Sequence, residues 1–130
     1  MSNTKPIPPN LHDLLVKLKV LGMIKRGTKI NMSTLTFTDA NSWYGAFQRS
    51  IDGEDRKNLM IHLKHIIEQS INALGEYQNT EFFKLIISNL AEAKIGIQNL
   101  SITYQSDPSI VAQIAVFISN IDLQLSMNPI

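Results

Sequence analysis

From Pro108 to Ile121 the sequence contains no charged side chain. The run begins at the proline of a Ser-Asp-Pro sequence, which is typical of a helix start. An N-cap carboxylate accepts backbone N–H groups, and proline at the first helical position lacks an N–H that would have no partner within the helix. We therefore predict a helix over 107–127. A helix without charges along most of its length has no well-solvated face. We expect the fold, a partner or both to bury it.

The stretch before it, 80–104, predicts a second long helix. Its apolar residues recur at three- and four-residue spacing, which places them on one stripe of an α-helix facing a core. They are Phe83, Ile86, Ile87, Leu90, Ile97, Leu100 and Tyr104. The two helices together are the part of the chain around which the rest must pack.

The N-terminal region predicts an arm followed by a helix. Residues 1–9 contain three prolines and read as a flexible arm. Asn10 is the expected N-cap of the first helix, with Asp13 in its first turn; the helix is expected to end near Gly22 or to run on to Gly27. Leu11, Leu14, Leu15 and Leu18 form its apolar stripe.

Between residues 27 and 38 the helical spacing disappears, and apolar residues alternate with Asn, Ser and Thr, so we expect an extended loop. Thr38 or Asp39 would then cap a shorter helix rich in aromatic residues. Trp43 and Phe47 are expected in the core, whereas Tyr44 and Arg49 are left open between core and surface.

A third long helix is expected after Gly53, with Glu54 and Asp55 in its first turn, and Gly75 and Asn79 at its end. Its predicted buried stripe is Leu59, Leu63, Ile66, Ile67, Ser70 and Leu74. The fold class is therefore all-α: a bundle of four main helices plus one shorter helix, in a single domain over 10–130. The length of 130 residues agrees with one domain.

Composition limits the function classes. The chain has no cysteine, which excludes disulfides and thiolate metal sites, and its 18% of charged residues is below the usual quarter for soluble domains. We expect no signal peptide. We also expect no membrane span, because Gln113, Ser119 and Asn120 interrupt the longest charge-free helix. An intracellular, cytoplasmic location follows as an expectation.

The basic residues are unevenly distributed. Half of the twelve lie within residues 1–38, where Asp13 is the single acidic residue. A basic segment at 17–29 could contact nucleic acid or another anion, or it could be a solvated surface. Its members are Lys17, Lys19, Lys25, Arg26 and Lys29.

Catalytic and metal sites have little support. His62, His65 and Glu68 repeat every third residue and include ligand types for zinc or iron, but this spacing turns them around a helix rather than toward one point. No glycine-rich phosphate loop or nucleophile elbow is present. We predict no enzyme activity and no cofactor. Gly96, inside a predicted helix, is expected to allow close approach of a neighbouring helix.

The charge-free C-terminal helix is the better candidate for a protein interface, because it carries more apolar surface than one bundle face usually requires. Tyr44 and Arg49 are further candidates, since aromatic residues and arginine are enriched in binding hot spots. The apolar candidates are Ile110, Ile114, Phe117, Ile118, Ile121 and Leu125.

Three segments resemble a known group of proteins. They are Ser-Trp-Tyr-Gly-Ala-Phe-Gln-Arg-Ser at 42–50, Gly-Glu-Asp-Arg-Lys-Asn at 53–58, and Gly-Ile-Gln-Asn-Leu-Ser-Ile-Thr-Tyr-Gln-Ser-Asp-Pro at 96–108. The chain is similar there to small helical proteins of unassigned role from nucleocytoplasmic large DNA viruses. That resemblance implies a viral origin and a place in the virion or the replication compartment. It implies no active-site residue.

These observations predict a non-enzymatic helical protein that acts by protein–protein association, either with itself as a homo-oligomer or within a larger assembly, as a viral structural or accessory protein would. The alternative is a nucleic-acid-binding accessory protein that uses the basic segment 17–29.

Overall fold

The computed structural model describes residues 7–24, 46–47, 49–51, 53 and 55–127. Four long helices make up most of this part: α1 (Pro9–Gly22), α3 (Arg56–Glu76), α4 (Phe82–Thr103) and α5 (Pro108–Met127). Residues 46–47 and 49–51 are also helical and belong to a shorter helix. The described residues contain no strand, and the prediction of an all-α bundle with four main helices and one shorter helix is confirmed.

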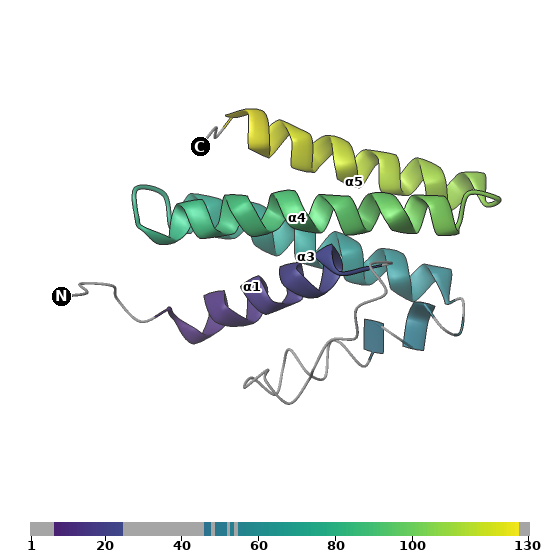
Figure 1. Ribbon diagram of the computed structural model, residues 1–130, viewed down its shortest axis with the longest axis horizontal. Coiled ribbons are helices and arrows are strands. Elements are labelled where there is room, and N and C mark those ends of the chain that lie inside the picture. Colours follow the sequence, from purple (N-terminus) through teal and green to yellow (C-terminus); the bar gives the residue numbers. More distant parts are fainter. Residues whose placement is uncertain (1–6, 25–45, 48, 52, 54, 128–130) are drawn as a thin grey trace.

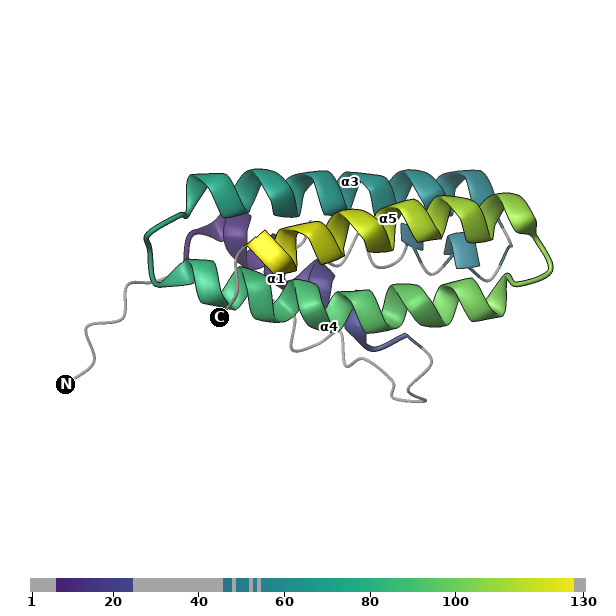
Figure 2. The same cartoon turned by 90° about the horizontal axis from the view of Figure 1, so that it is seen from above.

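Helices α3 and α4 form a central pair, and the other two long helices lie on opposite sides of it. α1 packs mainly against α4, and α5 packs against both α4 and α3. Figure 1 shows α1 and α5 separated by this pair. Viewed from above in Figure 2, α5 runs lengthwise between α3 and α4. One long side of α5 is therefore left facing away from the bundle.

The core is built from the stripes expected from the sequence. All six predicted residues of α3 are buried, as are the first four leucines of α1. On α4 the prediction is right except at its start, where Phe82 is buried and Phe83 is only half-buried. Phe47 of the short helix is 1% exposed, which confirms its placement in the core.

The helix starts were predicted with mixed success. Asp55 is the N-cap of α3, accepting the Asn58 N–H at 3.2 Å, rather than a first-turn residue. The first helix begins at Pro9, so the prediction of Asn10 as its N-cap was wrong, and so was that of Asp13 in its first turn. Proline needs no hydrogen-bonded N–H at this position, which lets the helix start earlier.

The α3–α4 turn depends on Asn79 rather than on Gly75. Asn79 has a φ of 66°, a left-handed conformation that asparagine tolerates better than most residues. Gly75 lies inside α3, one residue before its end. The resulting turn is short and reverses the chain, which makes α3 and α4 antiparallel neighbours.

Two glycines bring α1 and α4 into backbone contact. A Cβ added to Gly96 would lie 1.6 Å from the Leu21 carbonyl oxygen, and one added to Gly22 would lie 3.2 Å from the Glu92 carbonyl oxygen. Asn99 strengthens the crossing by donating a hydrogen bond from Nδ2 to the Ile24 carbonyl at 3.1 Å. The prediction that Gly96 allows close approach of another helix is confirmed.

Several sequence predictions lie outside the described residues. They concern the extended loop at 27–38, the cap at Thr38 or Asp39, Trp43, Tyr44 and Glu54.

Candidate interaction surface

Helix α5 is held to the bundle by only one of its sides. Ile110, Ile114 and Ile121 are its buried residues, and Phe117, Ile118 and Leu125 pack against the core while remaining partly exposed. These six residues were the predicted protein interface. The structure buries three of them in the chain's own core.

The opposite side of α5 carries a different set of residues, all exposed, which we call the α5 outer face. They follow one another at alternating spacings of four and three residues, the spacing that keeps side chains on one seam between packed helices. Val116 and Leu123 are 57% and 54% exposed. The set is Ala112, Val116, Ser119, Leu123 and Ser126.

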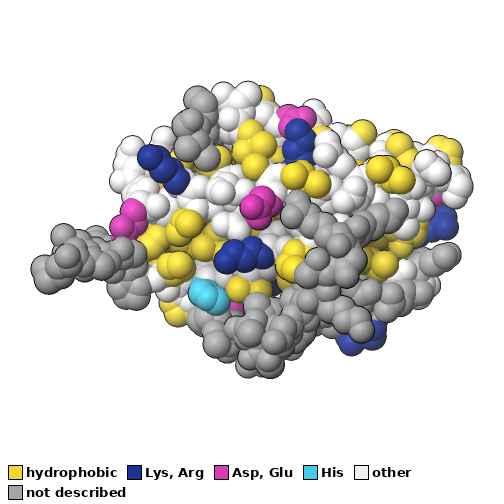
Figure 3. All heavy atoms as spheres, viewed as in Figure 1, with side chains coloured by type: hydrophobic (Ala, Val, Ile, Leu, Met, Phe, Trp, Pro, Cys, Tyr) yellow, Lys and Arg dark blue, Asp and Glu magenta, His cyan; other side chains and the backbone are white. Residues whose placement is uncertain are grey.

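No member of the α5 outer face is charged. The nearest charge on the same helix is Asp122, which lies one turn from Ser119 and Ser126 at the margin of this face and pairs with Lys94 of α4. In Figure 3 the surface over α5 is mostly hydrophobic or uncharged. An exposed helix face without charge is unusual in a monomeric domain.

Helix α5 also meets the length and composition criteria for a membrane-crossing helix, and no other described helix does. Within the chain, 17% of its most apolar window is buried. A helix that contributes one side to a soluble core meets the same criteria, so this finding leaves the expectation of no membrane span untested. It does show how little of α5 its own chain covers.

A groove of about 660 Å³ lies between the first half of α5 and the first half of α3, and we call it the α3–α5 groove. Its apolar surface comes from Met60 and Ile61 of α3 and from Ile110, Val116 and Phe117 of α5. Ile61 is 53% exposed, although it is a large aliphatic residue. Lys57 and Lys64 line the α3 edge, and Ser109 and Gln113 line the α5 edge.

One end of this groove is closed by a contact between Arg56 and Asp107. The guanidinium of Arg56 pairs with the Asp107 carboxylate and also lies 5.6 Å from the centre of the Tyr104 ring. Asp107 accepts the backbone N–H groups of Ser109 at 3.1 Å and Ile110 at 3.3 Å, which confirms it as the N-cap of α5.

The electrostatics of Asp107 follow from these contacts. The hydrogen bond from the Ile110 N–H is the largest influence and lowers the carboxyl pKa below its ordinary value; Arg56 and the Ser109 N–H act in the same direction, and partial desolvation opposes them. The ionised carboxylate is therefore the form that joins α3 to the start of α5.

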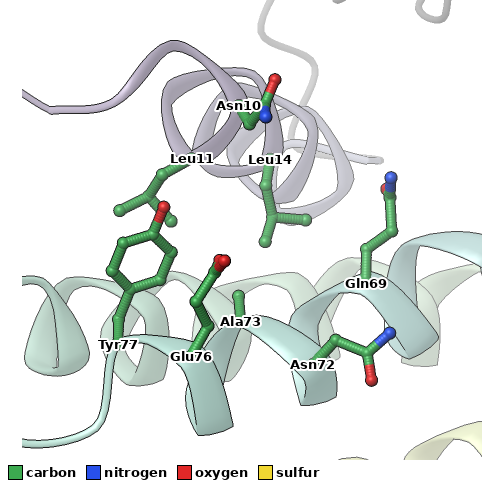
Figure 4. A pocket seen from close by; sticks show the side chains of 8 residues that line it. All are labelled: Asn10, Leu11, Leu14, Gln69, Asn72, Ala73, Glu76 and Tyr77. Atoms are coloured by element: carbon green, nitrogen blue, oxygen red, sulfur yellow. The ribbon is translucent and has the colours of Figure 1, made fainter.

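A second, smaller hollow lies between the start of α1 and the end of α3. Figure 4 shows its lining, which includes Asn10, Gln69 and Tyr77, and its volume is about 280 Å³. A neighbouring hollow of about 290 Å³ shares Gln69 and adds Asp13 and Lys17. Burial and the adjacent Glu76 raise the pKa of Tyr77. The two hollows are lined by a mixture of apolar, polar and charged side chains, which defines no single class of ligand.

The predicted basic segment is only partly visible. Lys17 and Lys19 both lie on α1, where Lys17 is half-buried beside Asp13 and Gln69, and Lys19 is exposed. Residues two positions apart on an α-helix are rotated by about 200°, so these lysines point to different sides of α1. Lys25, Arg26 and Lys29 lie outside the described residues, and binding of nucleic acid by this segment stays a prediction.

The two histidines of α3 differ in their exposure. His62 is half-buried with its ring against the edge of Phe47, at a centroid distance of 6.4 Å, while His65 and Glu68 are exposed. Burial lowers the pKa of His62; the neighbouring His65 lowers it further and Asp55 raises it. Among the described residues no three His, Asp or Glu side chains are close enough to hold a metal ion. Arg49, proposed as an interface residue, is exposed.

Sequence reasoning missed both the α5 outer face and the α3–α5 groove. A signal for the first was present, because the stripe with the larger side chains should turn inward and leave the stripe of smaller ones outside. For the groove the signal was weaker: Lys57, Ile61 and Lys64 lie three or four residues apart on α3, but nothing in the sequence says which helix lies beside them.

Comparisons with known proteins return no match. No family model, no curated protein and no solved structure is similar to this chain at a significant level. The resemblance to proteins of large DNA viruses therefore stays a prediction.

Proposed function

We propose that this protein is a non-enzymatic helical module that associates with a second copy of itself through the α5 outer face. One observation carries the proposal: the residues of the α5 outer face are all exposed, follow the four-three spacing and carry no charge. The rest of the chain also buries only a small part of this helix. A structural or accessory role in a viral assembly, which the sequence resemblance implies, is compatible with such a module.

Packing of this face against its copy is physically favourable. Val116 and Leu123 are each about half exposed, and complete burial of such a side chain contributes about 1.5–3 kcal/mol relative to full exposure. Ala112, Ser119 and Ser126 are small and allow two helix backbones to approach closely. Because the face is uncharged, two identical copies do not repel each other. A two-fold contact uses the same patch on both subunits.

The test is sedimentation velocity of the full chain over a hundredfold range of concentration. We expect the wild type to shift from monomer to dimer and Leu123→Glu to remain monomeric, because it places a charge in the seam. Leu85→Glu is the matched control, since Leu85 is exposed and lies on α4 nine residues before Lys94, on the opposite side of that helix from α5. This control should dimerise as the wild type does.

A wild type that remains monomeric at all concentrations would contradict the proposal, as would equal effects of Leu123→Glu and Leu85→Glu. A third outcome would assign the face to a membrane surface instead. In that case the wild type floats with phosphatidylcholine vesicles, Leu123→Glu does not, and the wild type forms no dimer when vesicles are absent.

A further inference from the structure

The α3–α5 groove combines an apolar floor with a cationic edge. Met60 and Ile110 are buried at its base, and Ile61 and Val116 leave more than half of their surface exposed along its sides. Large aliphatic side chains facing each other across a groove gain free energy when a third apolar surface displaces water from between them. The groove is therefore shaped to receive apolar side chains.

The charged residues of α3 that line the groove are all positive. Lys57 and Lys64 are exposed, seven residues apart on α3, and so lie about 10 Å apart along the same side of that helix. No carboxylate of the described residues forms an ion pair with either of them. Asp107 is the acidic residue in the lining, and it is already paired with Arg56. The facing edge contributes Ser109 and Gln113, which are uncharged.

The groove opens to solvent rather than enclosing a cavity, which decides between kinds of occupant. A small ligand usually has most of its surface buried in its site, and an open groove does not provide that. An amphipathic helix needs only its apolar face covered and keeps its polar face in water. Acidic residues seven apart, flanking the apolar face of such a helix, would match the spacing of Lys57 and Lys64.

From these features we infer that the α3–α5 groove binds an acidic amphipathic helix of a partner protein. The apolar side chains of that helix fill the space between Ile61 and Val116, and its carboxylates lie beside Lys57 and Lys64. The inference does not rest on self-association, because Val116 is the single residue shared by the groove and the α5 outer face. Variants of the other residues affect one surface only.

The test uses two fluorescein-labelled synthetic 18-residue helices and the full chain. The acidic peptide has leucines at three- and four-residue spacing and flanking glutamates seven apart; the basic peptide has lysines in place of the glutamates. Fluorescence anisotropy at near-physiological salt should show binding of the acidic peptide and at least tenfold weaker binding of the basic one. The double variant Lys57→Glu/Lys64→Glu should lose about tenfold in affinity for the acidic peptide and gain affinity for the basic peptide.

Lys84→Glu is the matched control, since Lys84 is exposed on α4 and does not line the groove. It should bind the acidic peptide as the wild type does. Ile61→Glu should abolish binding without unfolding the chain, because Ile61 is exposed, and circular dichroism checks this. Equal binding of both peptides, or binding of neither, would overturn the inference. Tight binding of sodium oleate in the absence of the peptide would also overturn it. The same holds if Lys57→Glu/Lys64→Glu no longer dimerises as the wild type does.

Discussion

At Gly96 the backbone of α4 lies directly against the backbone of α1, and the nearest atom is the carbonyl oxygen of Leu21 rather than the flexible end of a side chain. A main-chain atom in a packed helix has no rotamer by which to move aside. A methyl group at this position therefore requires the two helices to separate, which weakens the packing of Leu18 and Leu21 against α4.

Gly96→Ala should lower the free energy of unfolding by about 2 kcal/mol or more, because the cost of overpacking exceeds the helix-propensity gain of about 1 kcal/mol. Gly75→Ala is the matched control: Gly75 is also helical, and a Cβ there meets no atom within 4 Å. It should be neutral or stabilising by up to about 1 kcal/mol. Urea unfolding monitored by circular dichroism measures both. Similar effects of the two substitutions would show that the α1–α4 crossing is not tight.

At the scale of the element, α5 is joined to the bundle at its N-terminus by Asp107, which caps the helix and pairs with Arg56 of α3. These contacts favour the ionised carboxylate and lower its pKa in the folded state. A lowered folded-state pKa gives stability that is present above the ordinary pKa of a carboxyl group. That stability is lost as the pH falls through the folded-state value.

Asp107→Asn should therefore lower the urea midpoint at neutral pH, and the difference from the wild type should shrink as the pH falls below about 4. Asparagine is itself a good N-cap, so this substitution removes the charge and keeps the cap. Asp122→Asn makes the same change at the exposed α5 residue that pairs with Lys94, and its effect should be smaller. A difference between Asp107→Asn and the wild type that stays constant down to pH 2.5 would contradict the role given to the carboxylate.

At the scale of the whole molecule, the two long helices on opposite sides of the α3–α4 pair have different degrees of cover. α1 is tied to α4 by backbone contact and has eight buried residues, whereas α5 has three. Stability of an oligomer depends on protein concentration, because the folded subunits are stabilised by mass action. Self-association through α5 should therefore be visible in thermal unfolding.

The Tm of the wild type should rise by several degrees as the concentration increases a hundredfold, and the Tm of Leu123→Glu should not change with concentration. Leu85→Glu should follow the wild type. Differential scanning calorimetry at matched concentrations measures this. A wild-type Tm that does not depend on concentration would count against association in the folded state.

Much of the fold could be predicted from the sequence because its signals are local. The stripes of α3 and α4 and the cap at Asp107 each depend on residues within a few turns of one another. The close approach at Gly96 was indicated by a glycine inside a helical pattern, although the residue that it meets, Leu21 of α1, lies far away in the sequence. The start of α1 was predicted two residues late, because proline at the first helical position needs no hydrogen-bonded N–H and the helix begins at Pro9. Phe83 was placed in the core in place of Phe82, because both fit a helical stripe equally well.

The sequence by itself determined where helices form and that α5 has no charged face, because periodicity, caps and composition are properties of neighbouring residues. Only the tertiary structure decided which side of α5 is left uncovered, and that Lys57, Ile61 and Lys64 of α3 lie opposite Val116 and Phe117. The physical reason is that these contacts depend on how each helix is rotated against helices about 50 residues away. That rotation is set by the packing of the whole core, to which each local stripe contributes only one part.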